Sequence, residues 1–210
     1  MNDLLLRTAT GLVLIILALA AALKGGNVFA FVVAAAATAL FYEWTRLVRS
    51  WGVGWQISGF FYALVPAIAL LWVRERDDHG LMLLLWVFIV TWSTDIGAYF
   101  AGRTLGRRKL APSISPNKTV AGLYGGIAAA ALLGGAWALF TGLGRPLLLL
   151  APLFGLAAQG GDLFQSWMKR RAGVKDSGGL LPGHGGVFDR LDGLVPVALL
   201  TALAQVAGLT

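Results

Sequence analysis

Cysteine is absent from the 210 residues, histidine occurs only twice, and charged residues make up 13% of the chain. The missing thiols exclude disulfide frameworks, thiolate metal sites and cysteine nucleophiles. The charged fraction is about half of the roughly 25% that soluble domains carry. So few charges exclude a disordered chain and argue against a soluble enzyme.

Apolar side chains take the place of the missing charges. They make up 58% of the sequence, and 28 glycines come in addition. A globule of this size has too little interior to bury that much apolar surface, so the chain must be solvated by lipid. The net charge of +7 does not require nucleic acid, because a membrane protein carries such an excess in cytoplasmic loops and beside anionic headgroups. We expect no nucleic-acid partner.

Runs of about 20 apolar residues recur along the chain, which is the length that crosses a bilayer. They predict seven membrane-spanning helices near 4–23, 27–47, 57–73, 81–101, 120–142, 146–168 and 193–209, the last of them short. No soluble domain fits between them. The sequence therefore predicts one all-α, polytopic transmembrane bundle over 1–210, with N-terminal helices in 1–90 and a catalytic half in 91–196. The first run lacks a small-residue cleavage site, so we expect it to be retained.

The positions of lysine and arginine predict the orientation, because these residues concentrate in cytoplasmic loops. With seven spans, thirteen of the 17 fall on the N-terminal side and four on the other. The four are Lys24, Arg74, Arg76 and Arg145. We therefore expect a cytoplasmic N-terminus and an external C-terminus.

Three acids lie in the last part of helices that run toward the cytoplasm: Glu43, Asp95 and Asp162. A carboxylate inside a membrane costs a few kcal/mol on insertion scales, so it normally has a partner or a function. Three on one side, next to basic loops, predict a polar site that faces the cytoplasm.

The chemistry concentrates in residues 161–192. Asp162, Ser166 and Lys169 are spaced i, i+4 and i+7 and share one helical face. A carboxylate one turn from a hydroxyl suits Mg²⁺, and a lysine can meet a phosphate. Asp189 and Asp192 share a face if helical, and the glycines between 173 and 186 would let backbone N–H groups approach phosphate oxygens. The stretch predicts a metal–phosphate site.

A second polar stretch runs from Asp95 through Arg103 to Lys118 and Thr119. Pro116 breaks any helix there, and Lys118 comes just before the next span. Cations beside a helix N-terminus suit a pyrophosphate.

The motifs Ser166-x-x-Lys169-Arg170, Lys175-Asp176, Pro182-Gly-His-Gly-Gly186 and Asp189-Arg-Leu-Asp192 stand in a fixed order and spacing. In this arrangement the chain resembles the phosphatidate cytidylyltransferase family, membrane enzymes that make CDP-diacylglycerol. The stretches 95–103 and 115–122 resemble two further family patches. The resemblance covers about half of the chain, from Asp95 to Pro196.

The resemblance implies attack of a phosphatidic acid phosphate on the α-phosphorus of CTP, with release of pyrophosphate. It implies a Mg²⁺ centre at Asp162, Ser166 and Asp189, with Asp192 in support and a second cation conceivable. The cations Lys169, Arg170, Lys175 and Arg190 would bind the phosphates, with Lys118 and Arg103 in second rank. Asp95 and Asp176 would orient cations, and His184 either donates to a phosphate or only shapes its turn.

Three positions depart from the family pattern. Ala121 stands where an acid is usual, Gln165 where glutamate is usual, and Gly193 where serine is common. The chain is also shorter than most members. The first two changes remove negative charges near the expected site, so activity or the metal set could differ.

Two other functions stay open. A CTP-dependent polyprenol or phytol kinase also joins a lipid to CTP, but its alcohol acceptor needs a base. A cation-coupled transporter predicts acids near the midplane and an internal repeat, neither of which the sequence has. We expect a bacterial inner-membrane protein whose site faces the cytoplasm. Small-residue faces could pack helices within one chain or in a homodimer.

Overall fold

The computed structural model describes residues 3–76 and 79–210. Six of its helices are long: α1 (Asp3–Lys24), α2 (Gly26–Leu47), α3 (Val53–Glu75), α4 (Gly80–Leu105), α5 (Val120–Thr141) and α6 (Arg145–Arg171). Two short helices follow, α7 (Phe188–Leu191) and α8 (Leu194–Val206). The strands β1 (Lys109–Ala111) and β2 (Ser115–Thr119) form a small hairpin between α4 and α5.

The predicted membrane bundle is confirmed as a fold class. All six long helices are long and apolar enough to cross a bilayer, and the chain is an integral membrane protein. The seventh predicted span corresponds to α8, which has 13 residues. At about 1.5 Å per residue it extends for roughly 20 Å, short of the roughly 30 Å hydrocarbon core. The number of crossings and the orientation stay predictions.

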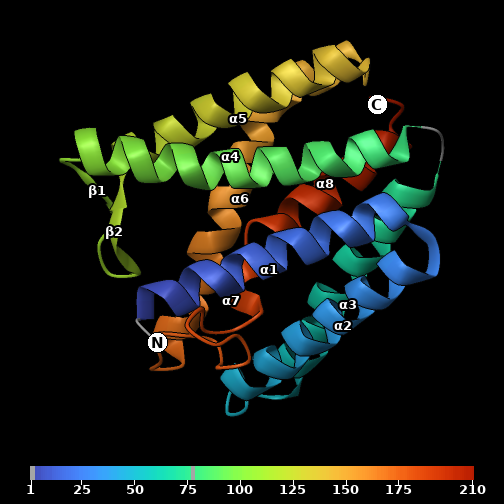
Figure 1. The fold of residues 1–210 in the computed structure, drawn as a ribbon. Coiled ribbons are helices and arrows are strands. Elements are labelled where there is room, and N and C mark those ends of the chain that lie inside the picture. Colours follow the sequence, from blue (N-terminus) through green and yellow to red (C-terminus); the bar gives the residue numbers. More distant parts are fainter. Residues whose placement is uncertain (1–2, 77–78) are drawn as a thin grey trace.

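The helices alternate in direction, so their ends gather at two opposite faces of the bundle (Figure 1). The N-terminus, the hairpin and α7 lie toward one face, and the C-terminus lies toward the other. At that second face, Arg74 Nε donates to the carbonyl of Ala22 at 2.7 Å, and Glu75 Oε1 accepts from the N–H of Gly26 at 2.9 Å. These bonds join the turn between α1 and α2 to the end of α3.

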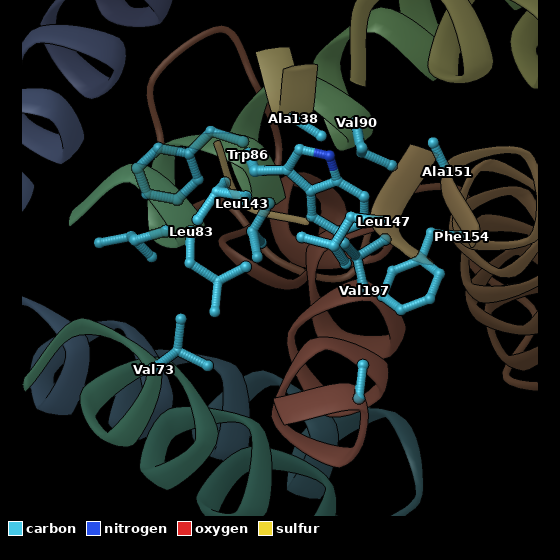
Figure 2. Packing of buried hydrophobic residues seen from close by; sticks show 14 of the residues in the cluster. Val73, Leu83, Trp86, Val90, Ala138, Leu143, Leu147, Ala151, Phe154 and Val197 are labelled. Carbon is cyan, nitrogen blue, oxygen red and sulfur yellow. The ribbon is translucent and has the colours of Figure 1, made fainter. Parts of the chain in front are cut away.

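The core forms around Trp86 of α4, whose side chain is fully buried among residues of α3, α5, α6 and α8 (Figure 2). Its indole N–H donates to the carbonyl of Gly134 on α5 at 2.9 Å. Glycine also brings α4 and α5 together, because a Cβ on Gly97 would lie 2.5 Å from the Cβ of Ala129. Small residues at such a crossing let two helix backbones approach closely.

The hairpin was not predicted from the sequence. Its antiparallel strands pair Lys109 with Thr119 and Ala111 with Ser115. Thr119 then caps α5, since its hydroxyl accepts from the N–H of Gly122 at 3.1 Å. The hairpin and the cap fix Lys118, which directly precedes Thr119, at the face that carries α7.

Candidate functional site

A polar cavity of about 720 Å³ opens at the face that carries the hairpin and α7. Its walls come from the C-terminal part of α4, β2, the start of α5, the second half of α6, and the segment around α7. Nine of the predicted site residues line it: Asp95, Arg103, Lys118, Asp162, Lys169, Asp176, Asp189, Arg190 and Asp192. Residues almost 100 positions apart in the sequence therefore line one cavity, and their roles there stay predictions.

One acid–lysine pair joins α6 to the hairpin. Lys118 Nζ forms a salt bridge with Asp162 Oδ2, and both side chains are partly buried. Ser166 lies one helical turn from Asp162, and its hydroxyl donates to Asp162 Oδ1 at 3.4 Å. Two of the three residues predicted to share a face of α6, Asp162 and Ser166, are therefore in contact, with Lys118 added from another element, whereas the third, Lys169, pairs with Asp189.

A second acid–lysine pair joins α6 to α7. Lys169 Nζ lies 2.6 Å from Asp189 Oδ1. Asp189 Oδ2 accepts from the N–H groups of Ser177 and Gly186, each at 2.9 Å, and also lies 2.9 Å from the hydroxyl oxygen of Ser177. Burial raises the pKa of Asp189, but the bonds from Lys169, Gly186 and Ser177 outweigh it and hold the pKa below its usual range. Asp189 is thus an anionic anchor for the loop that precedes it.

The other acids form a group of like charge. Asp192 follows α7, and its Oδ1 accepts from the N–H of Gly193 at 2.8 Å. Burial, together with the negative charges of Asp162 and Asp95, raises the pKa of Asp192 to about 8. Within residues 3–76 and 79–210, no three acidic or histidine side chains converge closely enough to hold a metal ion by themselves. A cation here would need ligands from a bound substrate as well.

Four predicted residues lie outside the cavity lining. Ser166 contacts Asp162 but does not itself line the cavity. Arg170 is exposed, and its Nε donates to the carbonyl of Ile114 on the hairpin at 3.2 Å. Lys175 is exposed on the loop surface. His184 packs against α1, where its Nε2 would lie 3.4 Å from a Cβ placed on Gly11. This geometry favours the turn-shaping role of His184 over a phosphate contact.

Glu43 occupies a different place from the one predicted. The prediction grouped it with Asp95 and Asp162 in one polar site, yet its side chain is 1% exposed and does not line the cavity. It accepts hydrogen bonds from the loop between α6 and α7 instead. Its position at the correct end of α2 was predictable, but its contacts depend on how that loop folds back.

The glycine-rich loop is held by hydrogen bonds to acids of the chain itself. The N–H groups of Ser177, Gly186, Val187 and Phe188 donate to the chain's own carboxylates, Asp189 and Glu43. The prediction concerned the glycines between 173 and 186, and an approach of their N–H groups to phosphate oxygens stays a prediction. The glycines let the loop backbone come close to carboxylates, and these carboxylates are the side chains of Glu43 and Asp189.

Several polar residues of the cavity were not singled out as contacts: Tyr99, Asn117, Thr119 and Gln159. Tyr99 carries a readable signal, because it lies one helical turn before Arg103, and its hydroxyl accepts from Arg103 at 2.5 Å. Gln159 lies one turn before Asp162, and its Nε2 donates to the carbonyl of Leu123, which also lines the cavity, at 3.0 Å. Ser177 was missed because nothing local distinguishes it from other loop serines.

The segment that contains this cavity matches a known protein family. Residues 49–206, three quarters of the chain, match the model of the cytidylyltransferase family, and they contain all of the cavity lining. The chain belongs to the cytidylyltransferase family.

Similar proteins carry a more specific name. A phosphatidate cytidylyltransferase of Brucella suis is 48% identical over 178 residues, which cover 82% of this chain and 63% of that protein. The phosphatidate cytidylyltransferase of Bacillus subtilis is 49% identical over 123 residues, covering 57% and 46%. That of Pseudomonas aeruginosa is 39% identical over 179 residues, covering 82% and 66%. The chain spans less than two thirds of the length of these relatives.

The positions that depart from the cytidylyltransferase pattern lie in or beside the cavity. Gln165 lines it and is 1% exposed, and its Nε2 has no hydrogen-bond partner among the described residues. Gly193 is buried, and a Cβ there would lie 3.3 Å from the methyl of Thr91. A serine at 193 would therefore require Thr91 to shift slightly. Ala121 lies in the first turn of α5 and outside the lining.

Proposed function

We propose that the chain transfers the cytidylyl group of CTP to phosphatidic acid, giving CDP-diacylglycerol and pyrophosphate in phospholipid biosynthesis. One observation carries the proposal: in a cytidylyltransferase, a cavity lined by acids and cations opens at one end of a bundle that has six long apolar helices. A lipid headgroup stays at that depth because its acyl chains remain in the bilayer. Water-borne CTP can reach the same place from outside the membrane.

The reaction joins a phosphate oxygen of phosphatidic acid to the α-phosphorus of CTP and breaks the bond to the β-phosphate. A phosphomonoester has a second pKa near 6, so the attacking oxygen is largely deprotonated at neutral pH. No strong general base is required. The site has to align the two phosphates and to neutralise their charge, which is the main contribution of protein groups to phosphoryl transfer.

The residues of the cavity can meet both requirements. Lys118 and Lys169 would bind triphosphate oxygens, and Arg103 and Arg190 would hold the outer phosphates or the lipid phosphate. The Nε2 of Gln165 offers a further donor inside the cavity, since it is buried there without a partner among the described residues. Asp95 and Asp176 would orient these cations. Arg170 and Lys175 could meet a headgroup only from the rim.

The donor set fits a magnesium ion that substrate phosphates help to hold. Mg²⁺ is commonly bound by one or two carboxylates together with phosphate oxygens and water. Asp162 and Asp189 would supply the carboxylates, with Ser166 and Asp192 beside them. Both acids are paired with long lysines that can turn toward phosphate oxygens. Bound Mg²⁺ would neutralise charge that develops on the triphosphate.

The membrane setting follows from the same proposal. The relatives are bacterial proteins, and we place this chain in the inner membrane with its cavity toward the cytoplasm, where CTP is made. Thirteen of the 17 lysines and arginines lie on that side in the predicted topology, which supports this orientation. A homodimer stays a prediction.

The proposal predicts turnover that needs three components. Purified chain in detergent with CTP, phosphatidic acid and Mg²⁺ should release pyrophosphate, and omission of any one component should stop the release. Lys24→Ala is a suitable control, because Lys24 is exposed at the C-terminal end of α1 and does not line the cavity. Turnover with a polyprenol and release of CDP would contradict the proposal, and so would a chain that binds no CTP.

A further inference from the structure

Glu43 fixes the end of α2 to a segment more than 130 residues away. Its Oε2 accepts from the hydroxyl of Ser177 and from the N–H of Phe188, both at 2.9 Å, and its Oε1 accepts from the N–H of Val187 at 3.0 Å. A buried carboxylate is stable only when donors of this kind replace water. The three bonds therefore both stabilise the buried carboxylate and hold the loop in place.

The loop backbone lies directly against this carboxylate. A Cβ on Gly178 would lie 2.5 Å from Glu43 Oε1, and a Cβ on Gly186 would overlap both Glu43 Oε2 and the Ser177 hydroxyl. A Cβ at 178 or 186 would therefore push the Glu43 carboxylate or the Ser177 hydroxyl out of its hydrogen bonds, which glycine avoids. The position of Glu43 thus explains two of the glycines of the loop.

The neighbour of Glu43 holds the same segment from its apolar side. Trp44 is 1% exposed and packs on the ring of Phe188, with ring centroids 5.7 Å apart. Its indole N–H donates to the carbonyl of Trp55 on α3 at 2.7 Å. Phe188 is therefore held at its N–H by Glu43 and at its ring by Trp44, and both belong to a helix that is itself tied to α3.

This clamp continues into the cavity through one hydroxyl. Ser177 Oγ lies 2.9 Å from Glu43 Oε2 and also 2.9 Å from Asp189 Oδ2. Asp189 in turn contacts Lys169 through its other oxygen. A continuous chain of contacts thus runs from α2, outside the cavity, through Ser177 to the pair formed by Asp189 and Lys169.

We infer that Glu43 is a positioning residue for the reaction: through Ser177 and Phe188 it sets the place of Asp189 and of Lys169 in the cavity. The inference rests on the proposed function. Glu43 does not line the cavity, so it acts on the loop and not on a substrate. A misplacement of reacting groups by about 1 Å can cost about a hundredfold in rate, so a clamp of this kind controls turnover more than binding.

The test compares Glu43→Gln, Ser177→Ala and the double variant in the pyrophosphate assay. Glutamine keeps the size of the side chain but sets an NH₂ group against at least one N–H donor of the loop. We expect each single variant to lower kcat by about 10- to 100-fold per CTP-binding site while KM for CTP changes less than about threefold. Both substitutions remove the contact between Glu43 and Ser177, so their effects should not multiply. The kcat of the double variant should therefore lie within about threefold of the kcat of the less active single variant.

Glu75→Gln is the matched control. Glu75 is also a helix-end glutamate that accepts a backbone N–H, from Gly26, but it is exposed at the opposite face. Its kcat should stay within about twofold of the wild type. Expressing kcat per CTP-binding site removes any loss that comes only from unfolded protein.

Three results would overturn the inference. The first is a kcat within twofold of the wild type in both single variants. The second is a double variant whose loss of kcat is the product of the two single losses. The third is a change in KM for CTP without a change in kcat. If Glu43→Gln fails to insert, Ser177→Ala alone decides by the same limits on kcat and KM. An inactive wild type would overturn the proposed function and the inference together, whereas an active wild type beside unaffected variants would overturn only the inference.

Discussion

Asp189→Asn should leave the protein inserted in the membrane and reduce its turnover to background, a loss of at least about a thousandfold. The carboxylate accepts from Lys169 on one oxygen and from Ser177 and Gly186 on the other. An NH₂ group on either side would face a donor, so a buried N–H or the ammonium would lose its acceptor. Lys169 would also lose its counter-charge, and the carboxylate proposed for Mg²⁺ would be gone.

The measurement is pyrophosphate release at saturating CTP and phosphatidic acid, together with the yield of protein extracted from membranes. Insertion should be normal because Asp189 lies outside the six long helices. Near-normal turnover of the variant would show that neither the metal assignment nor the anchoring role of Asp189 is correct.

Asp162→Asn should lower turnover by about a hundred- to a thousandfold and raise the Mg²⁺ concentration needed for half-maximal activity. Asp162 forms the salt bridge with Lys118 and lies near Asp95 and Asp192. Removing its charge takes away one of the two carboxylates proposed for the metal. It also leaves Lys118 without its partner, so the position of a bound triphosphate should loosen.

A Mg²⁺ titration of turnover distinguishes these effects from general damage. Glu75→Gln, an acid-to-amide change at the opposite face, should keep the wild-type titration curve. If Asp162→Asn keeps more than a tenth of the turnover and an unchanged Mg²⁺ midpoint, Asp162 has no part in metal binding.

The helices were predictable because lipid imposes a simple rule on composition. Six of the seven predicted spans coincide with long helices to within a few residues at most of their ends. The last predicted span, 193–209, was expected to be short and corresponds to α8, which begins at Leu194 and ends at Val206, and whether it crosses the bilayer stays a prediction. The hairpin was missed because its pairing, Lys109 with Thr119, follows from contacts with neighbouring elements and not from an alternating apolar pattern.

The site was predictable where spacing alone determines geometry. The i, i+3 spacing of Asp189 and Asp192 put both in the cavity, as did the end-of-helix positions of Asp95 and Asp162. The partners of these acids were not predictable. Lys118 meets Asp162 only because the hairpin folds against α6, and Glu43 meets Ser177 only because the loop returns to α2. Contacts of that kind depend on tertiary packing, which a single sequence does not encode in any local pattern.

The most direct test of the proposed nucleotidyl transfer follows the phosphorus atoms of CTP. The purified chain would be given phosphatidic acid, Mg²⁺ and CTP labelled either at the α- or at the γ-phosphorus, and the lipid and aqueous products would be separated. We predict that the α-label enters the lipid fraction while the γ-label leaves as pyrophosphate. Entry of the γ-label into the lipid would mean phosphoryl transfer by a kinase and would contradict the account.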